Sequence, residues 1–471
     1  MAYPHDKASA IRGVMIQKQE ALGLIKRKMV ELEGDLSRFA AVHFPHNHNL
    51  LPNEILSRIF VLAVQDYGTV AFPMSTDHDP PQLTVSHVCS HWRMVAFRTS
   101  ELWSNTSLTY KRNNFQTVHL HQRWLTRAGT LPVTLSVTFD GSSYFSESEI
   151  ASALKKILLP FRVKRLLLSM SYGRFIGLWE FPEIVLSRVT DVELDLTVYS
   201  GEADISMSSP HHFITRLRSV MLRGNDMARC LNKLSLNLPW SQLRCLEFYR
   251  DVEDLQIVVD ILRKIPLLQR LVLTVCRSNI DTPEELTMPS LEDFILVEAN
   301  GNGTELDKIL HSFALPSLMK ISLQTYGLWT SETFEILKRQ YNLQGLQEVR
   351  FIGGFMLPVS YILCNSPILQ LLSLGRDAII DDEAITGISS GTLGKCLKRL
   401  EFKAACKRDV EEMLGMAEAR KRTADRLIAN GCTGKEEITI LSYMEIDWHD
   451  GDKYIKRVEA LMEAGIKILF V

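Results

Sequence analysis

The sequence predicts an α/β fold in which one strand-and-helix unit is repeated and stacked into a curved solenoid, with a small all-helical module in front of it. A short apolar pattern recurs at a nearly constant interval through most of the 471 residues. Helical apolar spacing fills the stretches between its copies, and a purely helical pattern precedes them. The apolar fraction of 46% and the charged fraction of 23% are those of an ordinary globular chain.

The repeated pattern is an apolar residue, two free positions, an apolar residue, one free position and a third apolar residue. Ten copies follow one another, and their first residues lie 23 to 28 positions apart. The copies are Val163-Leu166-Leu168, Val189-Val192-Leu194, Leu217-Val220-Leu222, Leu243-Leu246-Phe248, Leu268-Leu271-Leu273, Leu291-Phe294-Leu296, Leu318-Ile321-Leu323, Leu346-Val349-Phe351, Leu369-Leu372-Leu374 and Leu397-Leu400-Phe402. This interval is the period of leucine-rich repeats, in which a short strand opens each unit. We therefore expect a leucine-rich-repeat horseshoe of about ten repeats over residues 161–471.

The regular interval ends after the tenth copy. A charged, alanine-rich helix is predicted over Asp409–Asn430. Strands over Glu437–Leu441 and Ile466–Val471 then flank a helix over Asp452–Ala464. A less regular last unit of this kind is what a stacked core needs as a cap. At the other end, residues 111–160 are predicted to hold a linker and the first elements of the solenoid.

The first residues, 1–45, are predicted to form a helix. Its apolar residues alternate at spacings of three and four, which is the seam of a coiled coil. They are Leu22, Ile25, Met29, Leu32, Leu36 and Phe39. This helix either docks on its own protein or pairs with a partner helix.

A small helical module is predicted over residues 46–110. Its first helix begins near Pro52, which suits a helix start because it has no amide hydrogen to leave unbonded. The stretch Tyr67–Gln82 is rich in Pro and Asp and is predicted to be a loop. A second helix follows it, with one apolar face formed by Val85, Val88, Trp92 and Val95.

Two segments of this module resemble the two halves of an F-box. The first is Leu51-Pro52-Asn53-Glu54-Ile55-Leu56 with Ile59-Phe60, and the second is Val88-Cys89-Ser90-His91-Trp92-Arg93 with Leu102-Trp103. With repeats behind them, the chain resembles the fungal, basidiomycete-type F-box proteins with C-terminal leucine-rich repeats. It departs from a compact F-box by a longer polar stretch within Gln65–Gln82, and a longer surface loop costs little free energy to close.

The resemblance implies a non-catalytic substrate-recognition subunit of an SCF-type ubiquitin ligase. The F-box would dock on the adaptor subunit, and through it on a cullin, while the repeats bind an unknown protein target. The adaptor-binding residues would be Leu51, Pro52, Ile55, Leu56, Ile59 and Phe60. The residues that hold the module together would be Val88, Cys89, Trp92, Leu102 and Trp103. Docking of a helix in a groove requires such an aliphatic and aromatic stripe. The alternative is that these side chains form the module's own core.

The free positions beside the middle apolar residue of each copy are expected to line the concave face, where solenoids commonly bind. They carry both signs of charge, as protein-binding surfaces do, whereas a face for nucleic acid would be mainly basic. The target-binding residues predicted here are Glu247, Arg270, Asp293, Lys320 and Arg350.

Composition argues against several other classes of protein. The 53 basic and 55 acidic residues give a net charge of -2, which provides no reason to expect nucleic acid as a partner. The chain has no apolar run long enough to cross a membrane. The eight cysteines form no CxxC pair, which indicates reduced thiols and a cytoplasmic or nuclear location. No cofactor or metal site is predicted, and the pair His119 and His121 is expected at the surface.

Two alternative functions are considered for this sequence. Gly387-Ile388-Ser389-Ser390-Gly391 matches the GxSxG pattern of hydrolases, with Asp447 and His449 after it. A nucleophile elbow requires a buried strand directly before the turn, but acidic residues from Asp381 onward precede this one. We therefore interpret it as a loop between repeats. The other alternative is a repeat scaffold that binds partners without serving a ligase.

Overall fold

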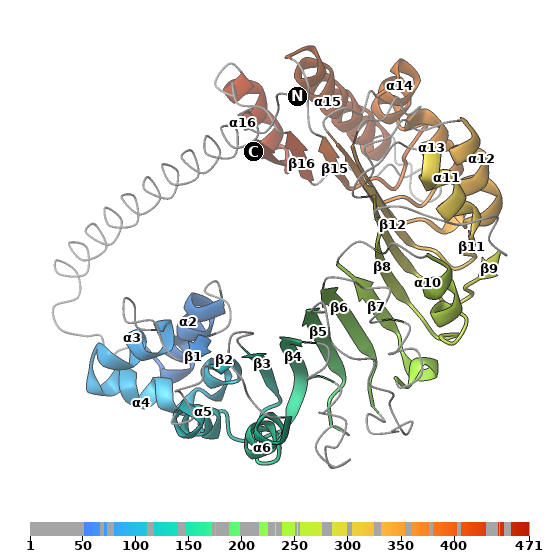
Figure 1. The fold of residues 1–471 in the computed structure, drawn as a ribbon. Coiled ribbons are helices and arrows are strands. Elements are labelled where there is room, and N and C mark those ends of the chain that lie inside the picture. The colour runs from blue at the N-terminus through green and yellow to red at the C-terminus, as the bar shows by residue number, and fades with distance from the viewer. Residues whose placement is uncertain are drawn as a thin grey trace, which may run out of the picture. The chain divides into compact units, whose positions relative to one another are not determined.

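The computed structural model describes much of the chain in separate stretches. They are residues 51–65, 70–72, 80–110, 117–139, 147–171, 175, 188–197, 216–224, 231, 238–249, 252, 255–275, 285–298, 304–324, 331–353, 359–375, 380–402, 407–429, 441, 443–446 and 454–470. The chain forms two compact units (Figure 1). Of the described residues, those from Leu51 to Leu102 form the helical unit, except that Val70–Phe72 belong, with Trp103 and the later described residues, to the sheet unit. The helix predicted over residues 1–45 lies outside the described residues.

The helical unit contains α2 (Asn53–Gln65), α3 (Pro81–His87) and α4 (Ser90–Arg98). The sequence predicted one continuous helix in place of α3 and α4, and this prediction was wrong. Cys89 separates the two, with an extended backbone at φ -156° and ψ 173°. Its sulfur accepts a hydrogen bond from the amide of Trp92 at 3.4 Å, so Cys89 is the N-cap of α4.

One face of α2 forms the interior of the helical unit. Leu56, Phe60 and Val64 follow one another at intervals of four residues, and all three are buried. The ring of Phe60 lies 5.0 Å from that of Trp92 on α4, measured between centroids. The hydroxyl of Thr99, which follows α4, donates to Ser57 Oγ at 2.8 Å. These contacts fix α2 against α4.

The sheet unit begins with β1 (Val70–Phe72), which lies inside the stretch that was predicted to be only a loop. The other strands are β2 (Asn105–Tyr110), β3 (Val133–Phe139), β4 (Val163–Ser171), β5 (Asp191–Thr197), β6 (Ser219–Gly224), β7 (Cys245–Phe248), β8 (Arg270–Val275), β9 (Leu286–Thr287), β10 (Asp293–Glu298), β11 (Phe313–Ala314), β12 (Lys320–Gln324), β13 (Glu348–Ile352), β14 (Leu371–Leu374), β15 (Arg399–Phe402), β16 (Tyr443–Ile446) and β17 (Lys467–Phe470). The α-helices are α5 (Thr117–Thr126), α6 (Glu147–Leu158), α10 (Leu255–Leu262), α11 (Thr304–His311), α12 (Ser331–Gln340), α13 (Val359–Asn365), α14 (Asp382–Ser390), α15 (Lys407–Ala429) and α16 (Ile455–Glu463). Short 3-10 turns are η1 (Ser100–Trp103), η3 (Trp240–Gln242) and η4 (Leu343–Gly345).

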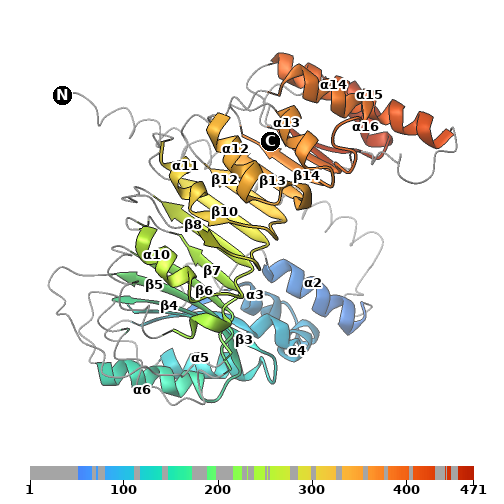
Figure 2. The same ribbon diagram turned by 90° about the vertical axis from the view of Figure 1, so that its right-hand side faces the viewer.

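Fifteen strands form one parallel sheet in chain order, and β9 and β11 form a separate parallel pair. The register brings the middle residues of successive copies of the pattern side by side. Val220 pairs with Leu246, Leu246 with Leu271, and Leu271 with Phe294. Figure 2 shows the central strands side by side with α11, α12 and α13 along the same side of the sheet.

The core of the sheet unit lies between the sheet and these helices. Every residue of the ten predicted copies is buried, and the most exposed of them, Val192, keeps only 8% of its surface accessible. The strand residues between them point to the opposite face, here called the strand face. The structure confirms the predicted α/β class and a long parallel sheet. In the last unit β16 begins at Tyr443, and most of the strand predicted over Glu437–Leu441 lies outside the described residues.

Candidate functional site

An apolar stripe lies on the exposed face of α2. Leu51 just before the helix is 44% exposed, and Ile55, Ile59 and Leu62 are 50%, 44% and 49% exposed. Their spacing of four, four and three residues puts them on one side of the helix. We call these four residues the α2 outer stripe. A continuous apolar face on a helix is suited to docking in a groove of a partner protein.

The six predicted adaptor-binding residues lie on both faces of α2. Leu51, Ile55 and Ile59 belong to the outer stripe, and Pro52 is exposed at the helix start, where its carbonyl accepts from the amides of Ile55 and Leu56. Leu56 and Phe60 are each only 1% exposed and pack inside the unit. Leu62 was missed, although the helical spacing that placed Ile55 and Ile59 on one face also reaches it.

The residues predicted to hold the module together also have different surroundings. Trp92 packs on Phe60, and Cys89 caps α4. Leu102 is buried, whereas Val88, between α3 and α4, is 59% exposed. Trp103 is fully buried in the sheet unit, where its ring lies 4.6 Å from that of Trp124.

A comparison with known families identifies this region. Residues 48–109 match the F-box-like family. The chain therefore carries an F-box-like domain, and α2, α3 and α4 all lie within it. A search of curated proteins gives no match to the chain.

The strand face of the sheet unit is a second candidate surface, outside the F-box-like domain. All five predicted target-binding residues lie on it, and they form ion pairs with residues of the next strand or, for Arg350, of the strand after that. Arg270 Nε donates to Glu247 at 2.9 Å, and a second nitrogen of Arg270 pairs with Asp293. Lys320 pairs with Glu348 at 2.5 Å and Arg350 with Glu401 at 3.2 Å. The charges predicted to meet a target thus already have partners within the chain.

Two carboxylates of the strand face are nearly inaccessible to solvent. Glu193 is 9% exposed and Glu247 is 7% exposed. Glu193 pairs with Arg165 at 3.4 Å and with Arg223 at 3.3 Å. Burial alone would raise the pKa of Glu247, but hydrogen bonds from Tyr249, Arg270 and Cys245 bring this pKa below its ordinary value. Glu247 is therefore held as an anion in a poorly hydrated place.

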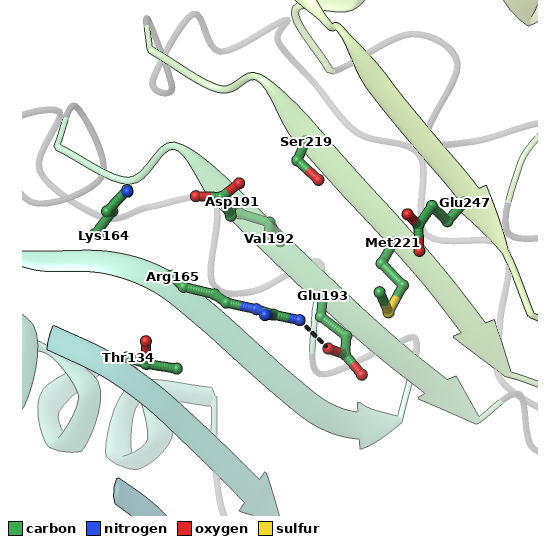
Figure 3. A pocket seen from close by; sticks show the side chains of 9 residues that line it. All are labelled: Thr134, Lys164, Arg165, Asp191, Val192, Glu193, Ser219, Met221 and Glu247. Carbon is green, nitrogen blue, oxygen red and sulfur yellow. Dashed lines mark hydrogen bonds and ion pairs between the residues drawn. The ribbon is translucent and has the colours of Figure 1, made fainter. Parts of the chain in front are cut away.

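A pocket of about 350 Å³ opens on the strand face above these carboxylates (Figure 3). The residues that line it come from β3 to β7. Lys164 of β4 lies at the rim, and Asp191, Ser219 and Met221 are among the others. The sequence reasoning did not single this pocket out. The signal for it was present in the acidic residues at alternate positions of β5, Asp191 and Glu193.

The GxSxG segment forms neither a nucleophile elbow nor the loop that the sequence predicted, because it lies at the end of a helix. Ser389 lies within α14, whose N-cap is Asp381, and the Ser389 carbonyl accepts from the hydroxyl of Thr423 on α15. Gly391 ends the helix in the left-handed conformation at φ 75°, as a C-cap glycine does. Asp447 and His449 lie outside the described residues.

His121 is not at the surface, as the sequence had suggested, but completely buried on α5. Burial lowers the pKa of its imidazole to about 4. Within the described part of the chain, no cluster of three His, Cys, Asp or Glu side chains could hold a metal ion. No described helix is long and apolar enough to span a membrane.

Proposed function

We propose that this protein is the substrate-recognition subunit of an SCF-type ubiquitin ligase. In this proposal the α2 outer stripe docks on the adaptor subunit, which links the chain to a cullin, and the strand face binds a protein target. The observation that supports it most directly is the exposed apolar face of α2 inside a segment that matches the F-box-like family. No bond chemistry is assigned to the chain, which acts by raising the local concentration of target lysines near the conjugating enzyme.

We also propose that the sheet unit is a leucine-rich-repeat solenoid of the kind found in fungal F-box proteins. The interval of the apolar pattern, the burial of all ten copies and the parallel strands in chain order support this assignment. The partners are then proteins rather than nucleic acid or membrane, and the place of action is the cytoplasm or the nucleus. The mixed charges of the strand face agree with a protein target.

Binding of the full chain to the purified ligase adaptor from the same source tests the docking proposal. Ile59→Asp places a charge in the outer stripe and should cost at least about 2 kcal/mol of binding free energy, as at interface hot spots. Isothermal titration calorimetry would measure the change. Ile455→Asp is the matched control, because Ile455 is equally exposed, at 45%, but lies on α16.

The control should bind as the wild type does, and circular dichroism should show that both variants are folded. Phe60→Ala does not serve this test, because emptying a buried site destabilises the unit itself by about 3–5 kcal/mol. If the wild type does not bind the adaptor, or Ile59→Asp binds equally well, the docking proposal fails and the scaffold interpretation takes its place.

A further inference from the structure

We propose that the pocket on the strand face receives the guanidinium group of an arginine side chain from the bound protein. This inference rests on the proposed function only in that the arginine belongs to the target. The floor of the pocket, its rim and its hydrogen-bonding groups each favour a cationic guest (Figure 3).

The floor of the pocket is formed by two buried carboxylates with Met221 between them. Glu193 pairs in register with Met221 on the next strand, and Met221 pairs with Glu247 on the strand after that. Neighbouring strands lie about 4.8 Å apart, so the backbones that carry the two glutamates are roughly 10 Å apart. The Met221 side chain lies between the two carboxylates, so a planar cationic group in the pocket would lie above the thioether.

The arginines of the protein neutralise these carboxylates from the sides. Glu193 is paired with Arg165 and Arg223, and Glu247 with Arg270. Asp191, two residues before Glu193 on β5, differs from both glutamates. Within the described residues its carboxylate accepts only from the hydroxyl of Thr190, at 2.6 Å. The pocket therefore contains one carboxylate without a cationic partner, and a bound cation would supply it.

The cations of the pocket are more hydrated than its anions. The Arg165 side chain is 48% exposed, and Lys164 is exposed at the rim. Water and salt screen exposed charges, whereas buried charges act through a lower dielectric. The exposed cations are therefore screened more strongly than the buried glutamates, and the carboxylate of Asp191 remains available to a bound cation.

Arginine suits this site better than lysine. Its guanidinium has five donors in a fixed plane, which suits the Asp191 carboxylate and the Ser219 hydroxyl, two acceptors that are neighbours in register on β5 and β6. An ammonium is a compact point charge and would satisfy fewer of these acceptors. The apolar stem of the arginine would pack on Met221.

Saturation-transfer difference NMR on the full chain can detect such binding, with Nα-acetyl-arginine amide as the probe. Nα-acetyl-citrulline amide is the matched probe, because it has nearly the same shape and no charge. We expect the citrulline probe to bind at least about tenfold more weakly, and Asp191→Asn to weaken binding of the arginine probe by about tenfold. Asp260→Asn on α10 is the matched control and should leave binding unchanged, because its carboxylate is on an exposed helix.

A second variant keeps the test decisive if Asp191→Asn is poorly folded. Ser219→Lys would place an ammonium inside the pocket and should abolish binding of the arginine probe. The inference is overturned if the two probes bind alike, if Asp191→Asn and Ser219→Lys bind as the wild type does, or if Nα-acetyl-glutamate amide binds more tightly. Adaptor binding by the same samples reports on the proposed function separately, since the α2 outer stripe takes no part in these measurements.

Discussion

Single buried ionisable residues hold distant parts of the sheet unit together. Arg420 on α15 is 1% exposed, and its guanidinium donates to the carbonyls of Ile388 at 3.1 Å and of Gly394 at 2.7 Å. It also reaches the carbonyls of Lys395 and Leu397. Burial lowers the pKa of Arg420 to about 10. These bonds tie α15 to backbone carbonyls at and beyond the end of α14, two of which, Ile388 and Gly394, also accept from the amides of Gly391 and Leu397.

His121 makes the stability of the sheet unit depend on pH. Its pKa is about 4 in the folded chain against an ordinary value of 6.5, so between these pH values the unfolded chain binds the additional proton. The stabilisation is present above pH 6.5 and is lost as the pH falls toward 4. At pH 5 the loss amounts to about 2 kcal/mol. Urea unfolding at pH 7 and pH 5 should show His121→Leu losing about 2 kcal/mol less between these pH values than the wild type.

The control for this prediction is His119→Gln, which changes an exposed histidine two residues away on the same helix. Its stability should fall with pH as that of the wild type does. An unchanged pH dependence in His121→Leu would show that other groups cause the acid sensitivity.

At the scale of residues, the sequence could place apolar side chains on α2 but not assign them to a face. Apolar residues occur on both sides of this helix, and the contact of Phe60 with Trp92 decides which side is interior. Likewise Arg420 is one of many charged residues in a helix that the sequence predicted correctly. Which of them meets the buried carbonyls at the end of α14 depends on the course of the chain after α14, and residue type alone does not reveal that.

At the scale of elements, the repeated pattern predicted ten strands, and β2, which precedes the first predicted copy, was missed for a visible reason. The first complete unit has Trp103, Thr106 and Leu108 at the three positions of the pattern, and all are fully buried. Because Thr106 at the middle position is polar, this copy does not fit a pattern of three apolar residues. Thr106 nevertheless pairs in register with Leu135 on β3, as the later middle residues pair with one another.

Two glycines should respond in opposite ways to alanine. Gly224 at the end of β6 has φ +147°, and a Cβ there would lie 1.9 Å from the carbonyl oxygen of Leu196 on β5. Gly415 lies inside α15, where a Cβ would meet only Arg457, at 3.9 Å. Gly224→Ala should therefore destabilise the chain by about 2 kcal/mol or more. Gly415→Ala should stabilise it by up to about 1 kcal/mol. Thermal unfolding by circular dichroism measures both, and a stabilised Gly224→Ala would contradict the conformation of β6.

At the scale of the whole molecule, the stack of parallel strands was predictable because each unit repeats the same pattern of three apolar residues. The pocket and the ion pairs were not predictable in the same way. Whether Asp191 lacks a cation depends on the directions that Arg165 and Arg223 take, and these follow from neighbours that are 20 or more residues distant in the chain. The sequence showed both signs of charge on this face, but not which of them are already paired.

A stack in which each strand pairs only with its two neighbours should lose stability locally when one unit is damaged. Phe294 on β10 is fully buried, with its ring 5.9 Å from that of Phe313, so Phe294→Ala should cost about 3–5 kcal/mol. Amide hydrogen exchange should then accelerate most in β8, β10 and β12, and least in β2, β3 and β15. Ile295→Ala, on the strand face of the same β10, is only partly buried and should change exchange far less. Equal acceleration in every strand would instead show that the sheet unfolds as one cooperative body.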